Sequence, residues 1–194
     1  VVGGAPGMTG AAVLAAMAGL NFGAGRVFVG LIDEMAQYNV VAEHPTLMVR
    51  RVELLPTETG CVVCGPGGGQ DVFALMPKLI ATARKLVLDA DALNGLATDS
   101  HLLKLFKQRA ARGFESVITP HPLEAARLLG KSAQDVQANR LQAAHTLAEL
   151  TQATVVLKGS GTIIAETGKT LVINPTGNAR LATAGTGDVL AGMI

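Results

Sequence analysis

The chain has 194 residues, a length that suits one domain, and its 49% hydrophobic and 16% charged residues argue against disorder. A net charge of +1 gives no basic footprint for nucleic acid, and no apolar run reaches the roughly 18 residues of a membrane span. No signal-peptide pattern opens the sequence, so we expect a cytoplasmic protein without membrane or nucleic-acid partners.

Strands alternate with helices in the first half of the chain. Short apolar runs predict strands at residues 1–2, 26–29, 47–54, 61–64 and 86–89. Small or aliphatic residues at helical spacing predict helices at residues 9–20, capped by Thr9, and 71–84. A polar connection separates the second and third strands.

The second half continues the alternation. Helices are predicted at residues 102–112, 122–129 and from the cap Ser132 to about 150, and strands at 116–119, 154–157, 162–165 and 171–173. A last helix follows Gly185 and continues to the end of the chain. Aromatic residues make up only 3%, so an aliphatic core must fill a mainly parallel α/β sheet with helices on both faces. Ligands in such folds bind beyond the carboxyl ends of the strands.

Two glycine-rich loops follow predicted strands. The first, residues 3–11, runs into a helix whose free amides suit an anion; the second, residues 65–69, holds three consecutive glycines. Each can also be an ordinary tight turn or connection.

A stiff loop surrounds His121, which lies between Pro120 and Pro122. A histidine with a nearby carboxylate, Glu124, at the end of a strand is a candidate for substrate contact or proton transfer. A hydrogen bond that stiffens the loop, and a favourable dipole position for Glu124, are the structural alternatives.

The segment Gly185-Thr186-Gly187-Asp188 gives the sharpest functional signal. Its glycines expose successive backbone amides at a helix start, an arrangement that binds phosphate or a developing oxyanion. Asp188 is then placed to take a proton from a substrate hydroxyl. Simple helix capping by Asp188 is the alternative, although capping alone does not need so much glycine.

Three weaker candidates remain. Lys158, followed by Gly159, Ser160, Gly161 and Thr162, suits a nucleotide phosphate, although in isolation a hairpin turn explains the segment better. Asp89 and Asp91 end a strand and can organise a metal or a loop, or Asp91 can cap a helix. The remaining histidines are interpreted as ordinary surface or packing residues: His44, His101 and His145.

The two cysteines, Cys61 and Cys64, have the C-x-x-C spacing of redox and zinc sites. On a strand, however, residues three apart point to opposite faces, and no second ligand pair is visible. We interpret them as small core residues in a reducing compartment.

Together the segments resemble one family. Residues 4–12 and 23–25 are similar to the first turn and helix of NAD(P)H-hydrate dehydratases, and residues 89–94 to their acidic segment. Residues 119–130, beginning Thr-Pro-His-Pro, resemble the most distinctive family signature, and residues 174–178 with 185–192 resemble a second. The departures are Leu123 and Ala184, where glycine is common, and residues 179–181.

The resemblance implies a ribokinase-like fold and a repair reaction. Enzymes of this family remove water from the S epimer of hydrated NADH or NADPH, using ADP in most bacteria and ATP in eukaryotes. Asp188 would contact the hydrate and act as the base, and Ala11, Gly67 and His121 would line its pocket. The nucleotide would be held by the turn that starts at Lys158 together with Gly187: Lys158, Gly159, Ser160, Gly161, Thr162 and Gly187.

The resemblance further implies Mg²⁺ beside the phosphates, without a nameable ligand set, and a homo-oligomer. An epimerase domain, fused or separate, would be a partner. The bacterial character of residues 119–124 favours ADP. Because the family domain continues at both ends, we expect residues 1–194 to be one such domain cut short at each end.

Two other functions remain open. A small-molecule kinase of the same fold would share Asp188 and the anion hole, although residues 119–124 argue against it. A non-catalytic nucleotide-binding domain is argued against by the intact Asp188.

Overall fold

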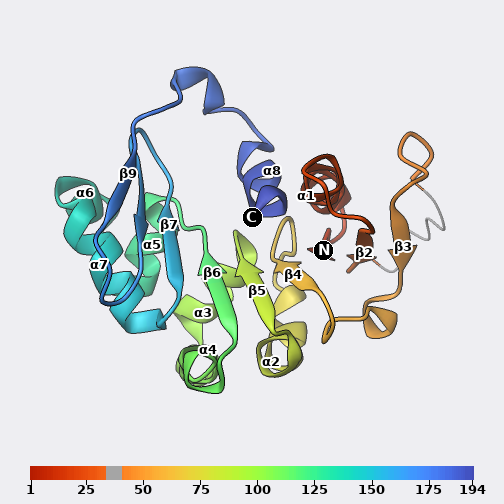
Figure 1. Ribbon diagram of the computed structural model, residues 1–194, viewed down its shortest axis with the longest axis horizontal. Helices are drawn as coiled ribbons and strands as arrows, with labels where there is room; N and C mark the ends of the chain where they lie inside the picture. Colours follow the sequence, from red (N-terminus) through yellow and green to blue (C-terminus); the bar gives the residue numbers. More distant parts are fainter. Residues whose placement is uncertain (34–40) are drawn as a thin grey trace.

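The computed structural model describes residues 1–33 and 41–194, and nine strands in these residues form one sheet in the order β3-β2-β1-β4-β5-β6-β7-β8-β9 (Figure 1). The strands are Val2–Gly3 (β1), Phe28–Leu31 (β2), Met48–Arg50 (β3), Cys61–Cys64 (β4), Lys85–Leu88 (β5), Glu115–Ile118 (β6), Thr154–Leu157 (β7), Thr162–Ala165 (β8) and Val172–Asn174 (β9). Neighbours from β3 to β7 pair in parallel, whereas β8 and β9 are antiparallel. The predicted, mainly parallel sheet is confirmed.

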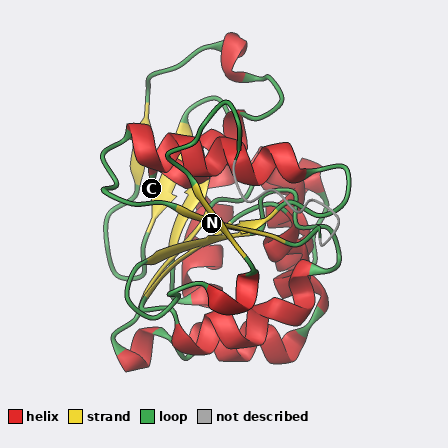
Figure 2. Ribbon diagram, turned by 90° about the vertical axis from the view of Figure 1, so that its right-hand side faces the viewer, coloured by secondary structure: helices red, strands yellow, loops and turns green. Residues whose placement is uncertain are grey.

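Helices cover both faces of this sheet (Figure 2). The α-helices are Thr9–Asn21 (α1), Val72–Thr82 (α2), Asp91–Thr98 (α3), Ser100–Lys107 (α4), Pro122–Leu129 (α5), Ala133–Ala138 (α6), Arg140–Thr151 (α7) and Thr186–Met193 (α8). Helices α1 and α8 pack against each other on one face, and α2 to α7 form the layer on the other. None of the helices in the described ranges is both long and apolar enough to cross a bilayer.

The alternation of side chains along the central strands builds two cores. Val62, Cys64 and Leu88 belong to the large core under α2 to α7, whereas Val63 and Val87 pack with Ala191 of α8. The prediction that the two cysteines lie on a strand and point to opposite faces is therefore confirmed, and both are free thiols. The prediction that both are core residues is right for Cys64, which is buried, and wrong for Cys61, which is exposed at the first position of β4.

Helix α8 approaches α1 closely because both helices carry glycine at the contact. A Cβ on Gly192 would lie 1.9 Å from the carbonyl oxygen of Ala15, and one on Gly19 would lie 3.1 Å from that of Gly192. This backbone-to-backbone packing fixes the direction of α8. Its first turn thereby lies at the carboxyl ends of the central strands.

Two helix predictions were wrong in detail. Thr9 does not cap α1, because the helix already begins at Thr9 and the preceding Met8 makes no side-chain cap bond. The long helix predicted after Ser132 is interrupted at Asn139. Ser132 caps only α6, and the Asn139 side chain accepts the amide of Gln142 to start α7.

Other boundaries also shifted. The strand predicted at 47–54 stops at Arg50 and gives way to a 3-10 turn, Val52–Leu54, and the helix predicted at 102–112 is α4 followed by a second 3-10 turn, Ala110–Arg112. Helix α3 was not predicted, and Asp91 is its first residue rather than its cap. The polar connection before β3 lies partly outside the described residues.

Candidate active site

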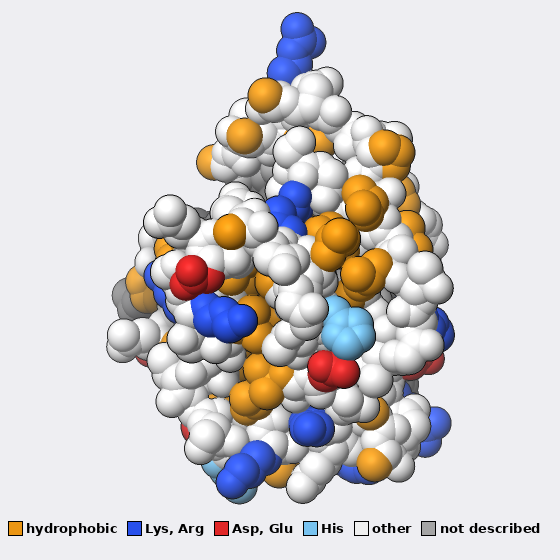
Figure 3. Space-filling model, turned by 90° about the vertical axis from the view of Figure 1, so that its left-hand side faces the viewer, with side chains coloured by type: hydrophobic (Ala, Val, Ile, Leu, Met, Phe, Trp, Pro, Cys, Tyr) orange, Lys and Arg blue, Asp and Glu red, His pale blue; other side chains and the backbone are white. Residues whose placement is uncertain are grey.

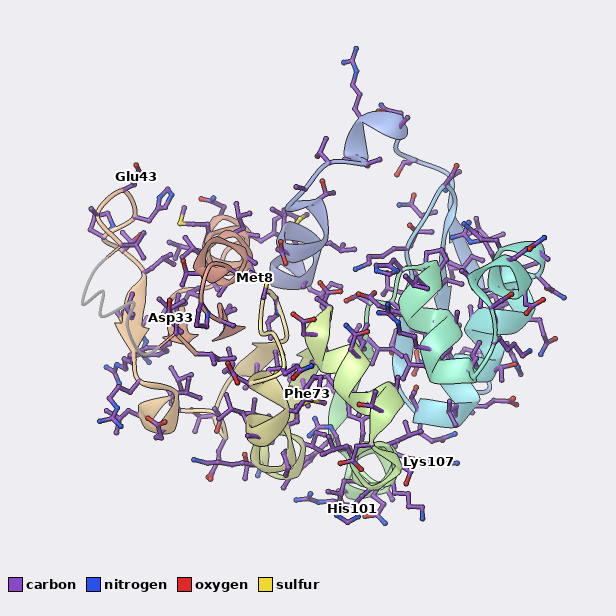
Figure 4. All side chains as sticks on the ribbon, turned by 180° about the vertical axis from the view of Figure 1, so that it is seen from behind. Met8, Asp33, Glu43, Phe73, His101 and Lys107 are labelled. Carbon is purple, nitrogen blue, oxygen red and sulfur yellow. The ribbon has the colours of Figure 1, made fainter. Side chains whose placement is uncertain are left out.

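The first two glycine loops lie against each other at the carboxyl end of β1 and β4. Gly4 N–H donates to the Pro66 carbonyl over 3.0 Å, and Ala5 N–H donates to that of Gly67 over 2.7 Å. Gly67 has φ +57°, and a Cβ there would lie 2.9 Å from the Cβ of Ala11. The structure thus brings Ala11 and Gly67 together, beside Met8, which Figure 4 labels close to α1 and α8.

The buried carboxylate of Asp89 is the centre of the neighbouring cluster. It directly follows β5, and its side chain is 2% exposed. The Thr119 hydroxyl, after β6, donates to its Oδ1 over 2.7 Å, and Lys158 Nζ, after β7, donates to the same atom over 2.7 Å. Three adjacent parallel strands therefore end in one hydrogen-bonded triad.

His121 and Glu124 form the cap of α5. The Nδ1 of His121 accepts the amides of Leu123 and Glu124 at 3.1 and 3.3 Å, and Glu124 Oε2 accepts the amide of His121 at 2.7 Å. The loop-stiffening bonds considered for His121 are thus present. They direct Nδ1 into the loop and leave Nε2 3.3 Å from Glu124 Oε1, with the His121 side chain 45% exposed.

This cap is electrostatically coupled to the triad. Glu124 Oε2 lies 4.0 Å from Lys158 Nζ. Burial raises the pKa of Glu124 to about 7, against the opposing effect of Lys158. Burial, with the positive charges of Lys158 and Arg127, lowers the pKa of His121, so its neutral form is favoured near neutral pH.

The first turn of α8 faces the same triad. Gly185, with φ +85°, precedes the helix, and a Cβ on Gly187 would lie 3.4 Å from Lys158 Nζ and 3.9 Å from Asp89 Oδ2. Burial and the nearby charges of Asp89 and Asp91 raise the pKa of Asp188. The N-cap of α8 is Gly185, so Asp188 lies inside the first turn and is not the cap residue of the helix. It therefore stands beside the helix amides as a base strengthened by its surroundings.

The segment from Lys158 to Thr162 forms the turn of the antiparallel hairpin between β7 and β8. The hairpin interpretation is confirmed, and it places Lys158 in the triad while Gly159 and Ser160 are exposed. Thr162 Oγ1 donates to the Gly159 carbonyl over 3.1 Å and closes the turn. Lys158 thus lies between this turn and the first turn of α8.

Asp91 ties the second glycine loop to the site. Its Oδ2 accepts a hydrogen bond from the backbone amide of Gly69 over 2.9 Å, and its Oδ1 accepts one from the side-chain amide of Asn94 over 3.3 Å. Asn94 Oδ1 in turn accepts from Arg127 of α5 over 2.7 Å. Asp91 acts here on loop position, one of the roles considered for it.

Other polar residues and cavities lie away from this cluster. Figure 4 shows His101 on α4, at the bottom of the view and away from Met8. A cavity of about 680 Å³ opens at the amino ends of β1, β2 and β4, where Val1, Phe28 and Cys61 line it. Ligands of doubly wound folds bind at the carboxyl ends, so this cavity is not the candidate site.

The central role of Asp89 was not predicted from the sequence. Its position after a strand was the available signal, but Lys158 lies 69 residues further along the chain. In the described residues no group of three or more His, Cys, Asp or Glu side chains is arranged to hold a metal ion. The site instead gathers three carboxylates, those of Asp89, Glu124 and Asp188, around one lysine.

Comparison with known proteins gives a consistent result. The family model described as NAD(P)H-hydrate dehydratase matches residues 1–194. An ADP-dependent (S)-NAD(P)H-hydrate dehydratase of Neisseria meningitidis is 42% identical over the whole chain, which spans 66% of that relative. A bifunctional NAD(P)H-hydrate repair enzyme of Escherichia coli is 37% identical, and the chain spans 37% of its length.

A solved structure supports the same assignment. The ADP/ATP-dependent NAD(P)H-hydrate dehydratase of Bacillus subtilis, co-crystallised with ATP and Mg²⁺, superposes with a TM-score of 0.77 at 28% identity. The match covers 98% of this chain and 68% of that one. A ribokinase-like protein of Enterococcus faecalis gives a TM-score of 0.78 at 26% identity. The fold is therefore ribokinase-like, as predicted, and the chain belongs to the NAD(P)H-hydrate dehydratase family.

Proposed function

We propose that this protein dehydrates the S epimer of hydrated NADH or NADPH and restores the reduced cofactor, with ADP or ATP as co-substrate. One observation carries the proposal: Asp188 stands in the first turn of α8, which faces the pair of Lys158 and Asp89. Membership of the family and the names of the relatives support the substrate class.

The geometry suits a reaction in which the hydrate hydroxyl is phosphorylated and phosphate then leaves. Asp188 takes the hydroxyl proton, a role favoured by its raised pKa. The amides at the start of α8, around Gly187, bind the transferred phosphoryl group, and Lys158 neutralises part of its charge. Ala11, Gly67 and His121 enclose the hydrate. The rest of the nucleotide is held by the four residues of the turn: Gly159, Ser160, Gly161 and Thr162.

The donor set suits Mg²⁺ brought in with the phosphates. Mg²⁺ is usually held by one or two carboxylates together with waters and substrate phosphates, so a preformed protein cage is not required. Asp89 and Asp188 are the carboxylates beside the amides of α8. Their two negative charges outnumber the one positive charge of Lys158, which leaves a negative charge that a cation can neutralise. When bound, the ion would neutralise phosphate charge.

The partners follow from the same proposal. An epimerase activity would supply the S epimer, because hydration produces both epimers; several relatives are bifunctional repair enzymes. A homo-oligomer is supported by the edge strand β9, where Val172 and Ile173 are 55% and 54% exposed, and by the hydrophobic side chains on the upper part of the face in Figure 3. The cytoplasm, where NADH and NADPH turn over, is the expected location.

The test is a spectroscopic assay of the protein with hydrated NADH, with and without ADP or ATP. Recovery of NADH absorbance that requires a nucleotide supports the proposal, and the preferred nucleotide identifies the co-substrate. A well-folded, nucleotide-binding protein that restores no NADH would contradict it. A stable phosphorylated alcohol as the product would identify a small-molecule kinase instead.

A further inference from the structure

Arg140 occupies an unusual place in the fold. It is the first residue of α7, directly after the interruption at Asn139 that separates α6 from α7. An uninterrupted helix would carry this side chain in a different direction. The interruption turns the guanidinium toward the hairpin turn between β7 and β8, which is 17 to 20 residues further along the chain.

The guanidinium binds the backbone of that turn at three points. Its Nη1 donates to the Ser160 carbonyl, and its Nη2 donates to those of Leu157 and Lys158 over 3.2 and 3.3 Å. The Gly159 carbonyl does not bind Arg140; it accepts a hydrogen bond from the Thr162 hydroxyl instead. All four carbonyl oxygens from Leu157 to Ser160 therefore have side-chain donors inside the protein.

The glycine at the middle of the turn fits this contact. Gly159 has φ +143°, a conformation that other residues rarely adopt, and a Cβ there would lie 2.8 Å from Nη2 of Arg140. A side chain at this position would therefore strain the backbone and push the guanidinium away. The contact of Arg140 with the turn therefore requires glycine at position 159.

The charge of Arg140 is balanced by carbonyl groups in the part of the chain that the structure describes. No carboxylate there lies within ion-pair distance of the guanidinium, and its buried Nε has no hydrogen-bond partner. The carbonyl dipoles of residues 157, 158 and 160 are its partners. The amide of Lys158 donates to the Pro120 carbonyl over 2.9 Å. The carbonyls of Lys158, Gly159 and Ser160 are bound by side chains on one side, so the amides of residues 159–161, on the other side of the same peptide groups, are the ones that the turn can offer an anion beside Lys158.

We propose that Arg140 is a positioning residue for nucleotide binding: it holds the turn in its anion-accepting form and adds positive charge without touching the ligand. The inference rests on the proposed function, in which residues 158–162 hold the nucleotide. It predicts that loss of the guanidinium weakens nucleotide binding and raises the KM for the nucleotide, with little change in kcat.

The test compares the wild type with Arg140→Met, Arg140→Lys and the control Arg51→Met. The guanidinium of Arg51 is exposed and forms an ion pair with Glu53 at 3.4 Å. Calorimetric titration with ADP and with ATP should give about tenfold weaker binding for R140M, a smaller loss for R140K and none for R51M. The melting temperature and the split between KM and kcat are measured on the same samples.

The outcomes separate the two claims. A wild type that binds neither nucleotide contradicts the proposed function. A wild type that binds, with an R140M variant of equal affinity, overturns the role of Arg140, as does a fall in kcat at unchanged KM. Should R140M fail to fold, R140K decides: at least threefold weaker binding at an unchanged melting temperature supports the role, and wild-type affinity contradicts it.

Discussion

The two ends of the sheet treat buried charge in opposite ways. At the amino ends of β5 and β6, Arg109 is 1% exposed and donates to Ser116 Oγ, the Ile80 carbonyl and the Glu115 carbonyl over 2.7, 2.6 and 2.9 Å. At the carboxyl ends, Lys158 meets Asp89 and Glu124, with Asp188 close by.

The two sites differ in whether their charged groups are neutralised by partners within the protein. The bonds of Arg109 go to two backbone carbonyls and one hydroxyl, so the residue fastens α2 to β6, and at 1% exposure it is out of reach of a ligand. The carboxylates around Lys158 outnumber it, and burial raises the pKa of both Glu124 and Asp188. Burial of a charge does not by itself indicate function, whereas an excess of carboxylates with raised pKa beside a helix start marks a candidate functional site.

The comparison can be tested by changes in unfolding free energy, starting with the largest. Lys158→Met leaves the Asp89 carboxylate buried without its cation, which should cost about 3–5 kcal/mol in urea unfolding and most of the activity. The double variant with Asp89→Asn should regain most of the stability but not the activity. Lys85→Met is the matched control, because its pair with Glu115 is 3.7 Å long and mostly exposed.

That control should change the unfolding free energy by less than about 0.5 kcal/mol. If K158M and K85M had the same small effect on stability and activity, the two ends of the sheet would not differ as described.

Arg109→Met should cost about 3 kcal/mol, because three acceptors that are buried or partly buried lose their donor. The variant should nevertheless keep the wild-type kcat and nucleotide KM when rates are expressed per folded molecule. Urea unfolding and steady-state kinetics measure the two effects. A selective loss of kcat in folded R109M would contradict the distinction between Arg109, which stabilises the fold, and Lys158, which belongs to the candidate site.

Glu124→Gln should change the pH dependence of stability. The pKa of Glu124 is raised from 4.5 to about 7, so the folded state holds this proton more tightly than the unfolded state. Its stabilising effect is complete below pH 4.5 and is lost as the pH rises toward 7. Between pH 5 and 8, the wild type should lose about 2 kcal/mol more than E124Q.

Gln keeps the acceptor for the His121 amide, so the cap of α5 should survive in E124Q. Glu166→Gln, at an exposed pair with Lys169, is the control and should follow the wild-type profile. Parallel profiles for the wild type and E124Q would show that the Glu124 carboxyl titrates as an ordinary surface group.

Local signals were sufficient for much of the fold. The strands at 61–64, 154–157 and 162–165 and the helix at 122–129 were predicted to the residue, because glycine or proline lies beside most of their ends. The interruption at Asn139 was missed, although Asn139 is a local capping signal whose side chain accepts the amide of Gln142. The contact between Arg140 and the turn after β7 joins segments far apart in the chain and has no local signal.

In the candidate site, too, the features with a local sequence signal were predicted and those that depend on distant segments were not. The loops after the strands were identified from their glycines, prolines and charged residues, and Ala11 and Gly67 proved to be neighbours. The roles assigned to the individual site residues remain predictions. The triad of Asp89, Thr119 and Lys158 joins the ends of three strands, so it follows from sheet order rather than from any local pattern.

Asp188→Asn tests the central claim most directly. The wild type and D188N are compared in nucleotide binding and in nucleotide-dependent recovery of NADH from its S hydrate. The amides of α8 and Lys158 are unchanged in D188N, so binding should stay within about threefold, while kcat should fall by about 10²–10⁴-fold because the proton acceptor is lost. A D188N variant that restores NADH at the wild-type rate would contradict Asp188 as the base, and with it the assignment of this site.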